Sequence, residues 1–374
     1  MENNKTPSIR FKGFTDPWEQ RKLGDVVPIT MGQSPDGSTY SDTPSDYILV
    51  QGNADLQNGW VTPRIWTSQV TKKADAGDLI MSVRAPAGAM GKTAYNVVIG
   101  RGVAAIKGNE FIYQLLVKMN SNGYWKVLSC GSTFESLNSD NIKNADVLIP
   151  DVAEQEKIGE YFVNLDHLIT LHQRKYNKLL NVKKSMLEKM FPKNESNIPE
   201  IRFKGFTDPW EQRKLGDCFT ERVESMPDGE LISVTINDGI KKFSELGRHN
   251  NSNDDKSKYK KVCIGDIAYN SMRMWQGASG YSPYEGIVSP AYTVLSPNSG
   301  INSKCLAYQF KLPEMIHTFQ INSQGITSDN WNLKYPALSE IEIFVSKNEK
   351  EQAKIAEYFE GLDRLITLHQ RLYF

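Results

Sequence analysis

The chain has 374 residues, a length that allows two or three domains. Its 44 basic and 44 acidic residues give zero net charge, which excludes nucleic-acid binding through a general basic excess, so any DNA binding would need local charge or a partner. No stretch approaches ~18 consecutive apolar residues, the N-terminus has no apolar run of the signal-peptide kind, and the four cysteines form no CxxC pair. We therefore expect a cytoplasmic protein with reduced thiols.

Two segments of the sequence occur twice. The string IRFKGFTDPWEQRKLGD begins at Ile9 and recurs without a change at Ile201. The string EQEKIGEYFVNLDHLITLHQR begins at Glu154 and recurs with few changes at Glu351. The chain is therefore predicted to be an internal repeat, two copies of one unit whose ends match and whose interiors differ. We place the domains at residues 1–150 (first globular domain), 151–192 (central long helix), 193–347 (second globular domain) and 348–374 (distal long helix).

The two interiors, residues 26–150 and 218–350, contain short β-like runs separated by Gly, Pro, Asn and Asp. One helical stretch is expected near the end of the first, Glu110–Met119, and a helical region covering Cys305–Phe310 and Pro313–Ile321 near the end of the second. We therefore predict the α/β fold class, with two repeated mixed α/β domains that are each built on a twisted sheet and each followed by a long helix.

Short matches indicate that the two interiors are related. Gly-Asp-Leu-Ile at Gly77 matches Gly-Asp-Ile-Ala at Gly265. Each run leads within a few residues to an arginine, Arg84 or Arg273. The sequence therefore predicts the same strand, followed by equivalent loops, in both domains.

A heptad pattern without proline runs from Glu154 to Phe191, and its 38 residues would span roughly 57 Å, too long for a helix inside a small domain. The second copy of the pattern has about 24 residues. We predict that the two helices pack on each other as an antiparallel coiled coil; the alternative is that each is only the last helix of its globular half. The predicted seam residues are Ile158, Phe162, Leu165, Ile169, His172, Tyr176, Leu179, Ile355, Phe359, Leu362, Ile366 and His369.

His172 and His369 occupy equivalent positions in this seam. We expect them to be partly buried and hydrogen-bonded across the helix pair. The five histidines show no zinc-finger or HExxH spacing, so no metal site is predicted.

The sequence offers no catalytic constellation. Gly91-Lys92-Thr93 resembles the tail of a phosphate-binding loop, but Pro86 stands where that loop needs a glycine. No Gly-x-Gly-x-x-Gly and no Gly-x-Ser-x-Gly motif is present. We therefore predict that the chain is not an enzyme and binds no cofactor itself.

What the interiors do offer is side chains suited to reading bases. Residues 270–276 combine Asn, Arg, Trp and Gln, and residues 81–86 are their counterpart in the first half. Arginine can bind guanine through two hydrogen bonds, and Asn or Gln can do the same with adenine. The alternative is that the arginines form surface ion pairs and the tryptophan lies in the core. The candidate DNA-binding residues are Gln51, Asn53, Ser82, Arg84, Lys92, Arg101, Ser132, Thr133, Arg248, Asn270, Ser271, Arg273, Trp275, Gln276, Gln324 and Thr327.

Taken in order, these motifs resemble the specificity (S) subunits of type I restriction–modification systems. The resemblance rests on FxxxWEQRKLGD at Trp18 and Trp210, the GDL and GDI runs, the glycine-containing turns at Gly131 and Gly325, and the EQxKIxEYFxxLDxLIxLHQR helix after each domain. It covers nearly the whole chain, in order and in duplicate.

The resemblance implies two target-recognition domains that each bind one half of a bipartite site in double-stranded DNA. The two long helices would set the spacing between the half-sites and bind two modification (methyltransferase) subunits. Those partners would carry S-adenosylmethionine-dependent adenine-N6 methylation, and restriction subunits would add ATP- and Mg²⁺-dependent translocation and cleavage. The chain itself would catalyse nothing.

The helices depart from the family pattern, in which the two normally match in length. The shorter second helix predicts that part of the first is left uncovered. A competing hypothesis is a coiled-coil scaffold whose two globular domains bind proteins, and it predicts no sequence-dependent DNA binding.

Overall fold

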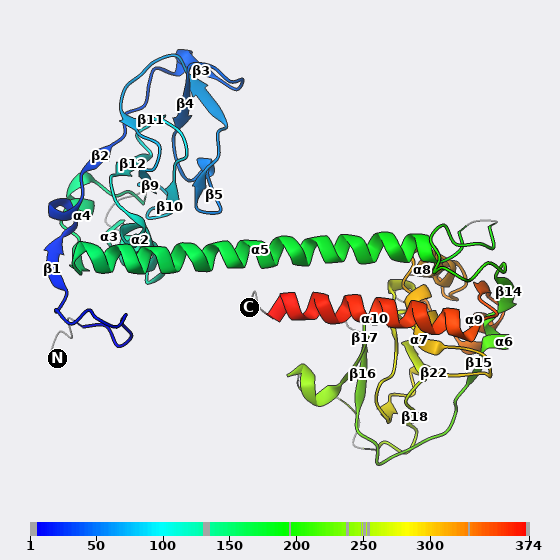
Figure 1. Ribbon diagram of the computed structural model, residues 1–374. Helices are drawn as coiled ribbons and strands as arrows, with labels where there is room; N and C mark the ends of the chain where they lie inside the picture. The colour runs from blue at the N-terminus through cyan, green and yellow to red at the C-terminus, as the bar shows by residue number, and fades with distance from the viewer. Residues whose placement is uncertain are drawn as a thin grey trace. The chain divides into compact units, whose positions relative to one another are not determined.

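Figure 1 shows the computed structural model of the chain. The structure describes residues 6–129, 135–193, 196–236, 239–247, 249, 252, 255–327 and 330–371. The chain divides into two compact units, Met1–Thr170 (unit 1) and Leu171–Phe374 (unit 2), whose boundary falls within helix α5 (Val152–Met190). Among the described residues, no helix combines the length and the apolar character that a membrane crossing needs.

Two β-sheets build the interior of unit 1. The six-stranded sheet has the order β2 (Ile29–Met31), β12 (Val103–Ile106), β9 (Leu79–Ser82), β10 (Met90–Lys92), β6 (Trp60–Val61) and β5 (Leu56–Gln57). The five-stranded sheet has the order β3 (Tyr40–Ser41), β7 (Ile65–Thr67), β4 (Tyr47–Val50), β11 (Val97–Ile99) and β8 (Lys73–Ala74).

Strand β9 shows how these layers pack, because successive side chains point to opposite faces of a strand. Leu79 and Met81 lie in the core cluster that includes helix α2 (Glu110–Ser121). Ile80, between them, lies in the cluster formed with the five-stranded sheet. The six-stranded sheet is therefore covered by helices on one face and by the second sheet on the other.

The helices of unit 1 agree only partly with the sequence. Helix α2 confirms the predicted stretch, and the Asn109 side chain caps it by accepting a hydrogen bond from the Ile112 N–H. The expectation of a single helical stretch is wrong, because α3 (Tyr124–Ser129) and α4 (Ser139–Lys143) follow α2, and a one-turn α1 (Leu23–Val26) precedes the sheets. These helices are too short to show a helical period in the sequence.

Unit 2 has the same plan with a smaller main sheet. That sheet has the order β15 (Phe219–Glu221), β22 (Tyr292–Pro297), β19 (Ile267–Asn270) and β20 (Ser279–Tyr281). Two strand pairs accompany it: β16 (Ile232–Thr235) with β17 (Gly239–Lys242), and β18 (Lys260–Val262) with β21 (Gly286–Val288). Its helices are α6 (Leu215–Cys218), α7 (Ser303–Gln309), α8 (Pro313–Ile321), α9 (Tyr335–Ser339) and α10 (Glu349–Arg371). The predicted fold class, two repeated mixed α/β domains each followed by a long helix, is confirmed.

Within unit 2, the end of α5 packs against α10. His172 Nδ1 lies 3.0 Å from His369 Nδ1, and Lys183 forms an ion pair with Asp363. The Phe191 ring stacks on the Phe359 ring further along. In these three contacts the residue numbers increase along α5 and decrease along α10, so the two helices are antiparallel. The predicted contact between the histidines is confirmed.

The predicted seam is only partly formed. On α10 all five predicted seam residues are buried, and on α5 Tyr176 and Leu179 are half-buried. Phe162 and Ile169, however, are 38% and 43% exposed, so their assignment to a packed seam is wrong for this structure. Both lie in the part of α5 that belongs to unit 1, whereas α10 belongs to unit 2. Coverage of the first part of α5 by a partner helix stays a prediction.

Ile158 and Leu165 are half-buried. Ile158 packs against the core of unit 1 that contains α2, rather than in a helix seam.

Candidate nucleic-acid interface

In unit 1, a buried glutamate fastens the repeated string to the start of the long helix. The Arg10 guanidinium donates two hydrogen bonds of 2.7 Å to the Glu154 carboxylate, and the Trp18 indole N–H donates a third of 3.2 Å. Glu154 is fully buried, and a carboxylate without access to water needs such donors. The string and the helix therefore hold each other in place.

Unit 2 repeats this contact with the equivalent residues. Arg202 donates to Glu351 at 2.5 and 2.8 Å, and the Trp210 indole N–H donates at 3.2 Å. The hydrogen bonds that Arg202 donates to Glu351 raise the pKa of Arg202. The arginine and the tryptophan of the repeated string therefore make the same contact in both units.

A pair of strands closes each interior beside this contact. In unit 1, β1 (Glu19–Lys22) pairs antiparallel with β13 (Asp146–Ile149). In unit 2, β14 (Glu211–Lys214) pairs in the same way with β23 (Glu342–Val345). We call each strand pair together with its Arg–Trp–Glu contact the frame: residues 9–25 with 146–154, and 201–217 with 342–351. The interior begins and ends at neighbouring positions of this frame.

Each frame carries a central strand that begins with the same turn. Gly77 before β9 and Gly265 before β19 both have φ +97°, a conformation that glycine adopts without strain. The side chain of the aspartate that follows accepts a hydrogen bond from the main chain three residues earlier. Asp78 Oδ2 accepts it from the Asp75 N–H, and Asp266 Oδ2 accepts it from the Cys263 N–H. The GDL and GDI runs therefore fix the start of equivalent strands.

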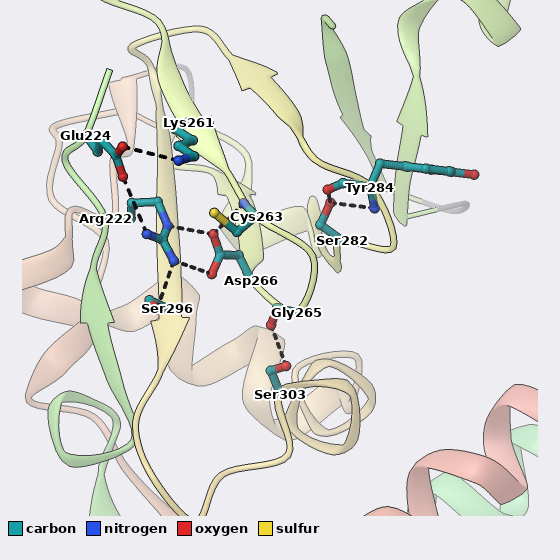
Figure 2. A network of polar contacts seen from close by, with 10 residues as sticks. All are labelled: Arg222, Glu224, Lys261, Cys263, Gly265, Asp266, Ser282, Tyr284, Ser296 and Ser303. Atoms are coloured by element: carbon teal, nitrogen blue, oxygen red, sulfur yellow. Dashed lines mark hydrogen bonds and ion pairs between the residues drawn. The ribbon is translucent and has the colours of Figure 1, made fainter. Parts of the chain in front are cut away.

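In unit 2 this turn is also held by an arginine (Figure 2). Arg222 donates to both carboxylate oxygens of Asp266, at 2.8 and 3.1 Å, and to Ser296 Oγ at 3.1 Å. Asp266 is 1% exposed, and its hydrogen bond raises the pKa of Arg222. Ser303 Oγ, at the start of α7, donates to the Gly265 carbonyl. The turn, the sheet and α7 are thus joined through one polar network.

Three loops of unit 1 meet at one edge, which we call the first edge (residues 51–53, 83–84 and 100–102). Strands β4 and β11 are parallel, so the residues after them lie side by side. The Gly102 carbonyl accepts a hydrogen bond of 2.9 Å from the Val83 N–H, and a Cβ on Gly102 would meet the Gln51 carbonyl. The predicted residues that the structure brings together here are Gln51, Asn53, Arg84 and Arg101, and both arginines are exposed.

In unit 2 the corresponding loop meets a second segment, and we call this the second edge (residues 270–276, 324–327 and 330–333). The Leu333 N–H donates to the Ser271 carbonyl at 2.9 Å, and the Trp275 and Trp331 rings make an edge-to-face contact at 5.3 Å. Arg273 is exposed, and its Nη1 donates to Gln276 Oε1 at 3.2 Å. The predicted residues gathered here are Asn270, Arg273, Trp275, Gln276, Gln324 and Thr327.

The two loops are equivalent in a register that differs by one residue from the sequence match. Leu137 donates its N–H to the Val83 carbonyl as Leu333 does to the Ser271 carbonyl, so Val83 and Ser271 correspond. Arg84 then corresponds to Met272, and Arg273 lies one residue further along. Arg84 lies in an isolated β-bridge with Ser136, whereas Arg273 leads into the 3-10 turn Met274–Gln276, so the two arginines extend from different backbone conformations.

Other predicted residues have structural roles. Ser82 is buried and donates to the Arg84 carbonyl, and Ser271 is buried and hydrogen-bonded to Thr293. Both serines are buried because Ser82 ends β9 and Ser271 directly follows β19, and these two strands lie in the core of their units. Lys92 forms an ion pair of 2.9 Å with Glu110, and its register opposite Leu79 places it at the start of β9, away from the first edge. Ser132, Thr133 and Arg248 lie outside the described residues.

The structure adds two residues that the sequence did not identify. Arg64 donates to the Ala54 carbonyl at 3.0 Å beside the first edge, and its side chain is 47% exposed. Trp331 contacts Trp275 at the second edge. Strand pairing places Arg64, because Ile65 of β7 lies opposite Leu49 of β4. Trp331 lies six residues after Gly325, where a turn was predicted. Its place near that turn could therefore have identified it as a candidate from the sequence.

The sequence was compared with protein families and with known proteins. Residues 15–181 and 207–373 each match the family model described as the type I restriction modification DNA specificity domain. A Methanocaldococcus jannaschii protein named for the MjaX specificity subunit of a type I restriction enzyme is 28% identical over 180 residues, 46% of this chain and 41% of that protein. The MjaIX specificity subunit of the same organism is 27% identical over 240 residues, 56% of this chain and 52% of that protein. The chain spans about half the length of these curated relatives.

A solved structure has the same fold over almost the full length. The crystal structure of a type I restriction–modification system S subunit from M. genitalium aligns with a TM-score of 0.55 over 98% of this chain and 94% of that chain. The sequence identity is 14%, so the likeness concerns the fold.

Proposed function

Because the chain belongs to the family of type I restriction modification DNA specificity domains, we propose that it is the non-catalytic DNA-recognition subunit of a type I restriction–modification complex. Unit 1 binds one half of a bipartite site in double-stranded DNA through the first edge. Unit 2 binds the other half through the second edge. We place this action in the cytoplasm, with the DNA of the cell.

One observation carries the proposal: two equal frames present two different sets of polar side chains. The first edge offers Arg84 and Arg101 with Gln51 and Asn53. The second edge offers Arg273 with amide side chains and a pair of tryptophans. Arginine and amide groups are the side chains that distinguish bases in the major groove, and two unlike sets would read two unlike half-sites.

The proposal extends to partners. Two modification subunits would supply S-adenosylmethionine and transfer a methyl group to adenine N6, and restriction subunits would supply the ATP- and Mg²⁺-dependent steps. Partners would also provide much of the phosphate contact, which reconciles DNA binding with a net charge of zero. The long helices would bind the modification subunits and set the half-site spacing.

The direct experiment is to co-purify the chain with its methyltransferase and sequence the methylated adenines across a genome. We expect one bipartite motif with a fixed spacer. Methylation without any sequence preference, or no DNA binding by the complex, would instead support the protein-binding scaffold.

Paired variants test whether each edge reads its own half-site. Arg273→Ala removes a charged donor from the second edge, and we expect about a tenfold loss of selectivity at one half-site with the other unchanged. Arg84→Ala should give the reverse pattern. Loss of selectivity at both half-sites with either variant would contradict independent reading.

The spacing role has its own test. Insertion of four residues between Asn177 and Asn181 adds roughly one turn, about 6 Å, to α5. We expect the number of unspecified bases between the half-sites to change while both half-sites keep their bases. An unchanged spacer would refute this role of the helix.

A further inference from the structure

A half-buried lysine contacts the main chain that follows residues 270–276 of the second edge. Lys311 follows helix α7, and its ammonium group donates to the main-chain carbonyls of Gly277 at 2.6 Å, Ser279 at 2.8 Å and Ile236 at 3.3 Å. An ammonium group has three protons, so these three acceptors use its whole donor capacity. The lysine therefore ties three points of main chain to one atom.

This arrangement is costly for a charged group. Burial, and to a smaller extent the nearby Lys183 ammonium, lower the pKa of Lys311 to about 8. A methionine or leucine would fill the same space without the cost of removing a charge from water. The charged lysine is therefore explained by the main-chain segments that its three carbonyl partners hold in place.

One of these carbonyls belongs to Gly277, which ends the turn that carries Arg273, and another belongs to Ser279, the first residue of β20. The 3-10 turn Met274–Gln276 ends at Gly277, whose φ is +83°. The Gly277 N–H donates to the Met274 carbonyl, and the Ala278 N–H donates back to the Arg273 carbonyl at 3.2 Å. Fixing the carbonyls of Gly277 and Ser279 therefore fixes the backbone from which Arg273 and Trp275 extend.

The other end of Lys311 is anchored to the long helix. In α7, the Tyr308 hydroxyl donates to Asp363 of α10 at 2.9 Å, and Lys304 pairs with Glu360 at 2.9 Å. The Tyr308 ring also contacts the Phe359 ring at 5.1 Å. Lys311 thus leaves a helix that is itself held on α10.

We infer that Lys311 is a positioning residue for base recognition: it holds the Arg273 turn of the second edge in register with α7 and α10, without contacting DNA itself. This inference rests on the proposed DNA-reading function of unit 2. It assigns the specificity of the second edge to a residue about forty positions from Arg273 in the sequence.

Unit 1 provides a matched control. Asn109 caps α2 as Asn302 caps α7, and counting from these caps brings Lys118 to the position of Lys311. Lys118 is exposed. The same substitution at the two positions therefore removes a half-buried tether in one unit and a surface charge in the other.

The experiment uses the full chain co-purified with its methyltransferase. Lys311→Met and Lys118→Met are compared with the unchanged chain by sequencing methylated adenines and by competition with DNA altered in one half-site. We expect Lys311→Met to lower selectivity about tenfold at the half-site that Arg273→Ala also affects, and to leave the other half-site unchanged. Lys118→Met should change neither, and a thermal unfolding midpoint within a few degrees would exclude loss of folding as the cause.

Selectivity equal to the unchanged chain, or an equal loss at both half-sites, would overturn the inference. If the unchanged complex shows no base preference at all, the proposed function fails instead, and the two failures are distinguishable. If Lys311→Met does not fold, the unchanged complex is measured at pH 7 and pH 9. Since deprotonation removes a donor and the charge, selectivity at that half-site alone should fall about threefold, and an equal change at both half-sites would count against the tether.

Discussion

The two units hold the same turn in different ways. In unit 2 the buried Asp266 is bound on both oxygens by Arg222. Arg222 lies opposite Val294 in the main sheet of unit 2. The equivalent residue in unit 1 is Thr30, which lies opposite Ala105. Asp78 therefore has a threonine, and not an arginine, at the position from which Arg222 binds Asp266. The cation there is Lys107, which pairs with Asp75 at 2.7 Å near solvent.

This difference contrasts with the frames, where the same Arg, Trp and Glu recur in both units. A frame contact joins three interlocking side chains, so changing one residue leaves the other two unmatched. The turn needs only a glycine conformation and an aspartate that accepts main-chain N–H groups, and the charge around it can come from different strands. Residues are repeated where side chains must fit one another, and only the backbone is repeated elsewhere.

The largest expected effect comes from breaking a frame. Glu351→Ala leaves the largely buried Arg202 without its carboxylate, and we expect the free energy of unfolding of unit 2 to fall by about 3 kcal/mol in urea denaturation. Glu154→Ala should weaken unit 1 in the same direction. If only one of the two variants is destabilised, the frames are not equivalent.

A smaller effect is expected at the turn that differs. Arg222→Ala leaves the buried Asp266 carboxylate without its arginine, which should lower the free energy of unfolding of unit 2 by about 2 kcal/mol. Thr30→Ala is the matched change in unit 1, where the side chain is exposed, and should stay within about 0.5 kcal/mol. Equal losses in urea denaturation would show that the turns depend on this strand position alike.

The smallest expected effect is a pH dependence confined to the helix pair of unit 2. Burial, and then the nearby Lys175 and His172, lower the pKa of His369 below its usual 6.5. The unfolded chain therefore takes up this proton first, so stability is present above about pH 6.5 and is lost as pH falls toward the folded pKa.

Thermal unfolding of the unchanged chain and of His369→Gln between pH 7.5 and 5 measures this effect. The variant should lose part of the acid destabilisation of unit 2. His167→Gln, at an exposed position of α5, should follow the unchanged chain. A variant with an undiminished acid effect would show that the histidine pair is not its source.

The repeated ends of the two units and the long helices could be predicted because their signals lie in the sequence itself, whereas the strand pairs and the Arg–Trp–Glu contacts of the frames were not predicted. The repeated strings mark the frames, and the heptad pattern marks α5 and α10. The extent of the seam could not be predicted for Phe162 and Ile169, because heptad spacing gives the face of a helix but not whether a partner covers it.

The edges were predictable by residue type and not by position. Gln51 and Arg101 meet because β4 and β11 are parallel neighbours, and nothing near either residue indicates that pairing. Lys92 resembles a phosphate ligand in sequence but pairs with Glu110, which lies on a different element. Lys311 gives no signal at all, since a lysine after a helix is ordinary until its three carbonyl acceptors are known.

The closing strand pairs have a consequence for how such a chain can change over generations. Lys22 lies opposite Asp146 in unit 1, and Lys214 lies opposite Glu342 in unit 2, so each interior is inserted between two adjacent points. Residues can be gained or lost inside that loop without redirecting the helix that follows. Among the described residues, unit 1 has eleven strands in its two interior sheets, and unit 2 has four in its main sheet and four more in two strand pairs, yet each unit ends in an equivalent long helix. An interior can therefore be replaced while the frame and the helix that follows it are left untouched.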